Sequence, residues 1–405
     1  MESMKLLGAL LDIGAAMIRS GAETHRVEDS LYRLTRSYGF TDCNIWVVPS
    51  NIQATVTEPG GQVLTQIRHI RSMGVDFHRL DELNSLCREA CAGTPSVEQL
   101  EERLKDIAAE APPPVWLTTL AAVLAGVGFG VFFQCDGWDA LVAGTASVLI
   151  AFLGRGLSRR ESNPLVYNFV IALLAECWIL LAVRVGIGHH GGAITVGVIM
   201  LLISALGTTN GVRDLVHLDT LSGVMNITLS FTGAIGIALG IALPLLVFGG
   251  AELPEVSGLT PDPVLQLIAA TVGCTGFALW FHVRGRKVVY CALGALLTWG
   301  VYLLAFRGLG SVFLATLCGS AACGLYAQIM ARVDKAPATI FMTVSVFPLI
   351  PGAALYYTMA ALVAREAALA RSKGIELVLV CFGIVLGYMF LEVLSKYLWG
   401  QRRRK

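Results

Sequence analysis

The spacing of hydrophobic positions divides the chain into two parts. Up to about residue 111, apolar side chains recur at helical or alternating spacing among charged ones, as in the run Leu6–Met17. From Pro114 onward they gather into stretches of about 20 residues, the length that an α-helix needs to cross a bilayer. Pro112 and Pro113 stand at the seam, where a helix from either side cannot continue. We therefore expect a small domain followed by a membrane block.

The first part predicts a small α+β domain in the order helix–helix–three strands–helix–helix. The strand-like runs are Cys43–Val48, Ile52–Thr57 and Gln62–Ile70, with turn residues between them. Ser96 with Gln99 three residues later matches a helix-capping box, which places the start of the last helix.

Polar residues cluster at the start of the second predicted helix. Ser20 with Glu23 three residues later also matches a capping box, which would make Ser20 the N-cap. His25 lies three and four residues before Glu28 and Asp29, a spacing that could hold a metal ion or equally form ion pairs on a solvated face. The motifs H-E-x-x-H and G-x-S-x-G are missing, so we expect neither a metal site nor an enzyme.

The second part contains ten stretches long enough to span a bilayer. They cover approximately residues 115–134, 139–157, 165–185, 192–212, 220–248, 263–283, 287–306, 311–331, 338–362 and 375–398. Adding about 145 to the first four starts gives 260, 284, 310 and 337, close to the observed 263, 287, 311 and 338; the fifth pair differs by about ten.

Five spans per unit is an odd number, so the second unit must be inverted in the membrane, as in many secondary transporters. The predicted fold is an α-helical polytopic membrane protein with ten transmembrane helices in a 5+5 inverted repeat, preceded by a small α+β cytoplasmic domain. The expected divisions are residues 1–111 for that domain, 112–250 for the first membrane half and 251–405 for the second with its basic tail.

Charge supports this division and orients it. Hydrophobic residues make up 55% of the chain and charged ones only 15%, against about a quarter in ordinary soluble domains. Thirty Lys and Arg against 29 Asp and Glu leave no basic surplus for nucleic acid. With the first domain inside, inner connections and the tail carry fourteen Lys and Arg and outer ones five, which predicts both termini in the cytoplasm. The ten cysteines are scattered and read as small apolar fillers.

Glycine and proline interrupt the fourth and ninth spans at corresponding positions of the repeat, where Leu206-Gly207 aligns with Pro351-Gly352. Irregular backbone inside a membrane is tolerated only against protein or a water-filled cavity, so each break is either a plain kink or part of a midplane substrate site. The candidate substrate-binding residues in and beside these breaks are Thr208, Thr209, Asn210, Asp214, Asn226, Pro348, Pro351, Gly352, Tyr356 and Tyr357.

Glu176 lies near the middle of the third span, deeper than any other acidic residue of the spans. A charge at the bilayer centre costs roughly 2.5–3.5 kcal/mol, which marks intramembrane acids as functional candidates. We expect Glu176 to bind a proton and a substrate ammonium group in turn, with Asn168 two turns earlier on nearly the same face. The alternative is a protonated Glu that hydrogen-bonds a neighbouring helix. Glu392, nearer the cytoplasmic end of the tenth span, is the second candidate for proton coupling.

Several segments resemble the bacterial threonine/serine exporter family. They are Gly21–Glu28 with Tyr38-Gly39, Val48–Ile52, Arg68–Ile70, Thr209–Asp214 and Pro348–Gly352. The resemblance covers nearly the whole chain, with both membrane halves fused, and it marks Glu23 and Arg26 as motif residues of the cytoplasmic domain. Leu206 departs from the pattern, because the family is expected to have Pro there.

This resemblance implies a secondary exporter of small amino acids in the bacterial inner membrane, driven by the proton gradient and working by alternating access around a midplane site. Its expected partners are a small-molecule substrate, protons and the lipid bilayer, with a homo-oligomer left open and no cofactor. Relatives with separate subunits are linked to succinate, so a dicarboxylate exporter remains an alternative, although a dianion would favour buried Arg or Lys. A membrane-anchored hydrolase with a catalytic N-terminal domain is the other alternative.

Overall fold

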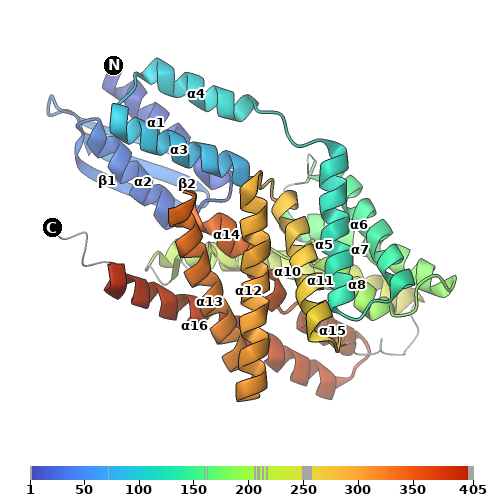
Figure 1. Ribbon diagram of the computed structural model, residues 1–405. Coiled ribbons are helices and arrows are strands. Elements are labelled where there is room, and N and C mark those ends of the chain that lie inside the picture. The colour runs from blue at the N-terminus through green and yellow to red at the C-terminus, as the bar shows by residue number, and fades with distance from the viewer. Residues whose placement is uncertain are drawn as a thin grey trace.

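The structure is a computed structural model. It describes residues 2–399 apart from positions 72, 159, 162, 205, 206, 208, 209, 212, 213, 216, 217 and 249–257. Residues 2–109 form a compact layer of helices and strands, called here the N-terminal block, which lies against one end of a group of long apolar helices (Figure 1).

The N-terminal block has the order of elements that the sequence predicts. Its members are α1 (Glu2–Arg19), α2 (Thr24–Ser37), β1 (Thr41–Val48), β2 (Asn51–Thr57), β3 (Val63–His69), α3 (Phe77–Gly93) and α4 (Val97–Ala109). The strands form an antiparallel sheet in the order β1-β2-β3. A tight turn pairs Val48 with Asn51, and the side chains of Thr55 and Thr65 hydrogen-bond across β2 and β3 at 2.9 Å.

Two helix starts in this block test the capping boxes that the sequence predicts. Ser96 caps α4 with Gln99 in a capping box, as predicted. The predicted cap at Ser20 is wrong, because Gly21 turns the chain with φ +94° and α2 begins only at Thr24, with Glu23 as its N-cap residue. Glu23 makes no capping hydrogen bond with its side chain, which instead points toward the apolar helices.

The apolar helices follow the predicted stretches closely. They are α5 (Val115–Phe132), α6 (Gly137–Leu157), α7 (Pro164–Arg184), α8 (Gly191–Ile199), α10 (Thr220–Phe248), α11 (Pro263–Trp280), α12 (Arg286–Leu309), α13 (Val312–Val333), α14 (Ala338–Ser345), α15 (Gly352–Val363) and α16 (Ala367–Trp399). Within the described residues, eight helices are long and apolar enough to cross a membrane, or nine if α14 and α15 count as one bent span. The predicted fourth span appears as α8, and its remainder falls partly outside the described residues.

Helices α5 and α11 pack against each other in the middle of this group (Figure 1). Gly276 lies against the backbone of Ala121 and Ala125, whereas Gly128 lies against Gly273 and Ala269. Residue numbers therefore rise along α5 while they fall along α11, and the two helices are antiparallel. Around them α7 packs on α10, and α13 packs on α16.

The predicted break in the ninth span is present. After α14 the chain forms a short 3-10 turn, η1 (Phe347–Leu349), and α15 leaves at 47° to the segment before it. Phe347 stacks on Phe277 of α11 with ring centroids 3.7 Å apart, and Phe129 of α5 lies 6.4 Å from it. Such aromatic pairs add about 0.5–1.5 kcal/mol beyond their buried area, so the break is anchored against α5 and α11.

Candidate functional site

Glu176 lies near the middle of α7 and is 2% exposed. The Thr195 hydroxyl of α8 donates a hydrogen bond to Glu176 Oε2 at 2.8 Å, and Thr195 is itself buried. Burying a carboxyl group costs free energy unless its oxygens accept hydrogen bonds. Thr195 supplies one such hydrogen bond. The sequence analysis had not singled out Thr195.

Tyr356 brings a third element to this pair. It belongs to α15, is almost fully buried, and lies near both Thr195 and Glu176. Tyr357 is also buried, with its ring 5.0 Å from that of Tyr356. Glu176, Thr195 and Tyr356 are called the midplane site below, after the position expected for Glu176 near the middle of its predicted span. Its members come from helices before and after the long connection at residues 249–262.

The broken span positions Tyr356. Pro348 is buried in η1, and Pro351 is the N-cap residue of α15. A Cβ atom on Gly352 would lie 2.6 Å from Met200 Sδ and 3.2 Å from Ile203 Cδ1, so α15 begins in close contact with the side chains that follow α8. Pro351 and Gly352 thus stand at the start of α15, one helical turn before Tyr356.

Asn168 serves a different contact. Its Nδ2 donates to the carbonyl oxygen of Gly233 in α10 at 3.1 Å. At 1.5 Å per residue, eight residues separate it from Glu176 by about 12 Å along α7. Asn168 thus joins α7 to α10, and the structure does not bring it to Glu176.

Asp214 and Asn226 belong to a second polar group, where the N-terminal block meets the apolar helices. Asn226 Nδ2 donates to Asp214 Oδ2 at 3.0 Å. Thr24 and Glu23 of the N-terminal block lie beside the same carboxylate. The Thr339 hydroxyl at the start of α14 donates to Glu23 Oε1. Glu23, Thr24, Asp214, Asn226 and Thr339 are called the junction cluster.

Other charged groups surround the junction cluster. Arg26 Nε lies 3.9 Å from Glu23 Oε2, and His25 Nδ1 lies 3.7 Å from Asp219 Oδ2. Burial, followed by the nearby Asp219 carboxylate, raises the pKa of Glu28. His25 therefore pairs with an acid outside its own helix, and the spacing with Glu28 and Asp29 forms no metal cluster among the described residues.

The predicted substrate residues thus divide between two places. Glu176 and Tyr356 lie in the midplane site, whereas Asp214 and Asn226 lie in the junction cluster. Asn210, four residues before Asp214, is also buried. Thr208, Thr209 and the side chain of Glu392 lie outside the described residues.

A third polar group, which the sequence analysis missed, joins the start of α6 to the connection between α7 and α8. His189 Nδ1 lies 2.6 Å from Asp136 Oδ2, and His190 Nδ1 lies 2.7 Å from Asp139 Oδ2. The backbone amides of both histidines also donate to Asp139 Oδ1. Ligand atoms of Asp136, Asp139 and His189 lie within 4.8 Å of one another, a donor set that could hold a metal ion. The hydrogen bond that His189 makes to the Asp136 carboxylate raises the pKa of His189.

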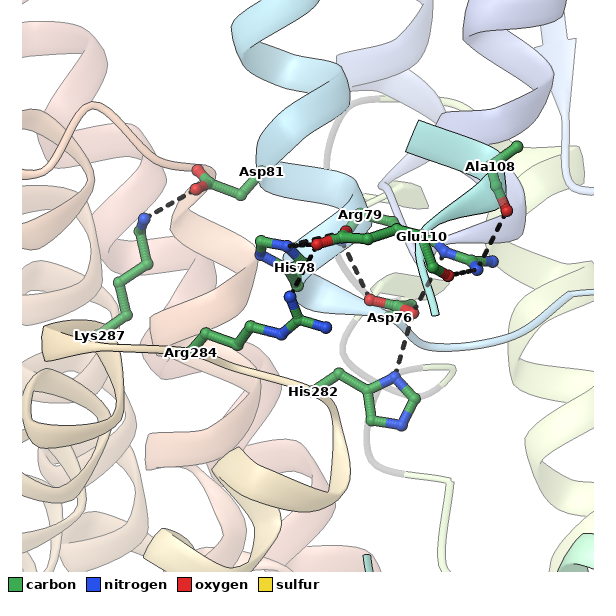
Figure 2. A network of polar contacts seen from close by, with 9 residues as sticks. All are labelled: Asp76, His78, Arg79, Asp81, Ala108, Glu110, His282, Arg284 and Lys287. Atoms are coloured by element: carbon green, nitrogen blue, oxygen red, sulfur yellow. Dashed lines mark hydrogen bonds and ion pairs between the residues drawn. The ribbon is translucent and has the colours of Figure 1, made fainter. Parts of the chain in front are cut away.

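Figure 2 shows how the N-terminal block is fastened to the connection between α11 and α12. His282 Nδ1 lies 3.0 Å from Asp76 Oδ2, and Arg284 Nη1 donates to Glu110 Oε1 at 2.8 Å. Lys287 Nζ donates to Asp81 Oδ2 at 2.7 Å. Six polar side chains in three pairs across one boundary hold the block in a defined orientation.

Comparisons with known proteins cover nearly the whole chain. A family model described as "Putative threonine/serine exporter" matches residues 9–248, and one described as "Threonine/Serine exporter, ThrE" matches residues 266–394. The "Probable threonine/serine exporter" of Mycobacterium tuberculosis is 24% identical over 375 residues, 88% of this chain and 70% of that protein. The "Threonine/serine exporter" of Corynebacterium glutamicum is 25% identical over 364 residues, 86% of this chain and 73% of that protein. No solved structure matches.

Proposed function

The chain belongs to the threonine/serine exporter family, and from this premise we propose that it is a proton-driven secondary exporter of small amino acids. The observation that carries the proposal is the midplane site, where a buried carboxyl group meets hydroxyl groups from two other helices. The protein is proposed to lie in the bacterial inner membrane with both termini in the cytoplasm.

The proposed architecture is an inverted repeat of two membrane halves, residues 112–250 and 251–405, after a cytoplasmic domain of residues 1–111. Two observations support it. Helices α5 and α11, which occupy the same position in the two halves, are antiparallel. The third and fifth helices pack together in both halves, as α7 with α10 and as α13 with α16.

Alternating access requires a site whose walls belong to parts that move against each other. In the midplane site, Glu176 and Thr195 come from the first proposed half and Tyr356 from the second. Rocking one half against the other would open the contact between Tyr356 and Thr195 toward one side of the membrane. The tight approach of Gly352 to Met200 is the point about which α15 would pivot on α8.

The chemistry of the midplane site favours a zwitterionic substrate. Ionised Glu176 can accept hydrogen bonds from an ammonium group, whereas protonated Glu176 is neutral and releases it. The substrate carboxylate can meet the amide groups at the start of α15, where the helix dipole is positive. Among the described residues, no Lys or Arg contacts Glu176, which leaves a dianion such as succinate without a counter-charge.

Counterflow in proteoliposomes tests this proposal. Vesicles loaded with unlabelled threonine or serine should take up labelled threonine transiently above equilibrium, because a carrier exchanges substrate across the membrane. Vesicles loaded with succinate should not. Counterflow with succinate alone would contradict the substrate assignment, and simple equilibration without overshoot would indicate a channel.

A further inference from the structure

The junction cluster has a property that the proposed export reaction does not use. Its acidic member Asp214 is 1% exposed, yet only one of its two carboxylate oxygens has a hydrogen-bond partner: Asn226 donates to Oδ2, and Oδ1 receives none among the described residues. Leaving a buried acceptor unsatisfied costs about 1–3 kcal/mol, and more for a charged group. Buried polar atoms without a hydrogen-bond partner are rare in native proteins, and such an atom points to a ligand that supplies the missing partner.

A second orphaned acceptor lies next to the first. Asn210 is 6% exposed, and its Oδ1 also lacks a partner within the part of the chain that the structure describes. Asn210 and Asp214 are four positions apart in the sequence, and both are helical. Between them, Gly211 packs on Gly223 and on Asn226 of α10, the residue whose amide holds Asp214.

The other side chains around Asp214 also carry carboxylate or hydroxyl oxygens. Glu23 lies close enough to Asp214 for their charges to repel. Thr24 lies beside the same carboxylate, and its buried hydroxyl oxygen is also without a hydrogen-bond partner within the described residues. Thr339 approaches from α14 and binds Glu23. Glu28 and Asp219 add acidic charge at the edge of the cluster. Three buried polar atoms that lack a hydrogen-bond partner among the described residues, Asp214 Oδ1, Asn210 Oδ1 and Thr24 Oγ1, together with the nearby acidic charge, form a site for a compact positive group that has several N–H donors.

We propose that the junction cluster binds a primary ammonium group, that of an amino acid entering from the cytoplasm, before the substrate reaches the midplane site. The identity of the ligand rests on the proposed export function, whereas the existence of a cation site does not. An ammonium group has three donors, which can meet the three acceptors that lack a partner in the described part of the chain, Asp214 Oδ1, Asn210 Oδ1 and Thr24 Oγ1.

The site also gives the N-terminal block a part in substrate capture. Glu23 and Thr24 stand at the start of α2, whereas Asp214 and Thr339 belong to the two membrane halves. The N-terminal block and both membrane halves therefore contribute residues to the junction cluster. The site would be complete only while the contacts in Figure 2 keep the block docked.

Ligand-dependent thermal unfolding of the full chain in nanodiscs tests the proposal. The Glu176→Gln variant is used throughout, so that the midplane carboxylate does not contribute. The ligands are threonine, 1-amino-2-propanol, which lacks the carboxylate, 3-hydroxybutyrate, which lacks the ammonium group, and sodium chloride. Threonine and 1-amino-2-propanol should raise the unfolding temperature with concentration, because a ligand that binds only the folded state stabilises it. The other two should not.

Adding Asp214→Asn should weaken binding and raise the half-saturating concentration of both amines by about tenfold to a hundredfold. A hydrogen bond to a charged group contributes about 1.5–3 kcal/mol. Glu23→Gln removes the charge that the N-terminal block brings to the same site and should also weaken amine binding. The second variant allows the proposal to be tested even if the first folds poorly. Asp29→Asn removes an exposed acid of the same helix that pairs with Arg33 and should change nothing.

Equal amine binding with and without Asp214→Asn and Glu23→Gln would overturn the proposal, as would stabilisation by sodium and not by amines. Loss of all amine binding on Glu176→Gln alone would place the only amine site at the midplane and would also overturn it. Failure of the export proposal is distinguishable, because it shows in counterflow and leaves this binding measurement unchanged.

Discussion

Gly128 of α5 and Gly273 of α11 touch backbone to backbone. A Cβ atom on Gly128 would lie 2.5 Å from the nitrogen of Gly273 and 2.7 Å from its Cα. The two residues are 145 positions apart, which is the offset at which the apolar stretches repeat. When two units are related by a two-fold axis, only residues beside the axis contact their own counterparts. We therefore propose that the axis of the inverted repeat passes next to this pair.

The close approach makes Gly128 sensitive to the smallest side chain. Gly128→Ala should push α5 and α11 apart and lower the free energy of unfolding by about 1–3 kcal/mol, as overpacking does in other cores. Gly156→Ala in α6 is the matched control, because a Cβ there meets nothing within 4 Å and Ala favours a helix by about 0.5–1 kcal/mol. Thermal unfolding of both variants in detergent checks this. Equal unfolding temperatures would show that α5 and α11 do not pack this tightly.

The orientation can be tested by thiol labelling in intact cells. In a variant whose ten cysteines are replaced, Pro261→Cys in the exposed segment before α11 should react with an impermeant reagent added outside. Lys105→Cys in α4 should react only after the membrane is permeabilised, because the positive charges of the connections place the N-terminal block inside. Labelling of position 105 in sealed cells would reverse the topology.

The contact between Asp76 and His282 predicts a pH dependence of docking. Burial alone would raise the pKa of Asp76, but the hydrogen bonds from His282 and from the Arg79 amide outweigh it and hold that pKa below its usual value. A lowered folded-state pKa contributes stability above the unfolded pKa of about 3.9, and this stability is lost as the pH falls through the folded value.

Asp76→Asn isolates this charge, since Asn caps a helix as well as Asp does and α3 should remain intact. The unfolding temperature of the variant should therefore fall less steeply than that of the wild type between pH 5 and pH 3, values set by the usual Asp pKa of about 3.9. Identical slopes would mean that the Asp76 charge does not stabilise the folded chain.

Hydrophobic spacing alone was sufficient to predict where most of the apolar helices lie. The starts of α5, α7, α10 and α11 agree with the apolar stretches within about one residue, because uninterrupted apolar runs and the prolines at their borders are local signals. The break at Pro348–Gly352 was visible for the same reason. The start of α2 was predicted three to four residues too early, since nothing in the sequence shows that Gly21 adopts a positive φ.

The composition of the two sites was not predictable in the same way. Thr195 and Thr339 are single polar residues in apolar runs, and their roles depend on Glu176 and Glu23, which lie in other helices. The predicted substrate residues formed one list, although the structure separates Asp214 from Glu176. Contacts between segments far apart in sequence decide such grouping, and spacing along one helix does not report them.

Tyr356 provides a test of the contact between the proposed halves. Tyr356→Phe keeps the ring and removes the hydroxyl group of a side chain that lies near Thr195 and Glu176. We expect the half-saturating threonine concentration for transport to rise about twofold to tenfold, the loss that corresponds to one neutral hydrogen bond. Tyr167→Phe in α7 is the control, since that hydroxyl lies near Gly154 of α6 and away from the site. Unchanged saturation with Tyr356→Phe would remove Tyr356 from the substrate site.

Glu176 carries the central claim, and proton-driven export by its Gln variant is the most direct test. Glu176→Gln keeps the shape of the side chain and removes its titration. Proteoliposomes are given a pH gradient, and threonine efflux is measured at several gradients alongside Glu376→Gln, which neutralises an acid that pairs with Lys373 on α16. We predict that Glu176→Gln inserts and folds but shows no gradient-driven efflux, whereas Glu376→Gln behaves as the wild type. Full pH-dependent efflux by Glu176→Gln would contradict the account.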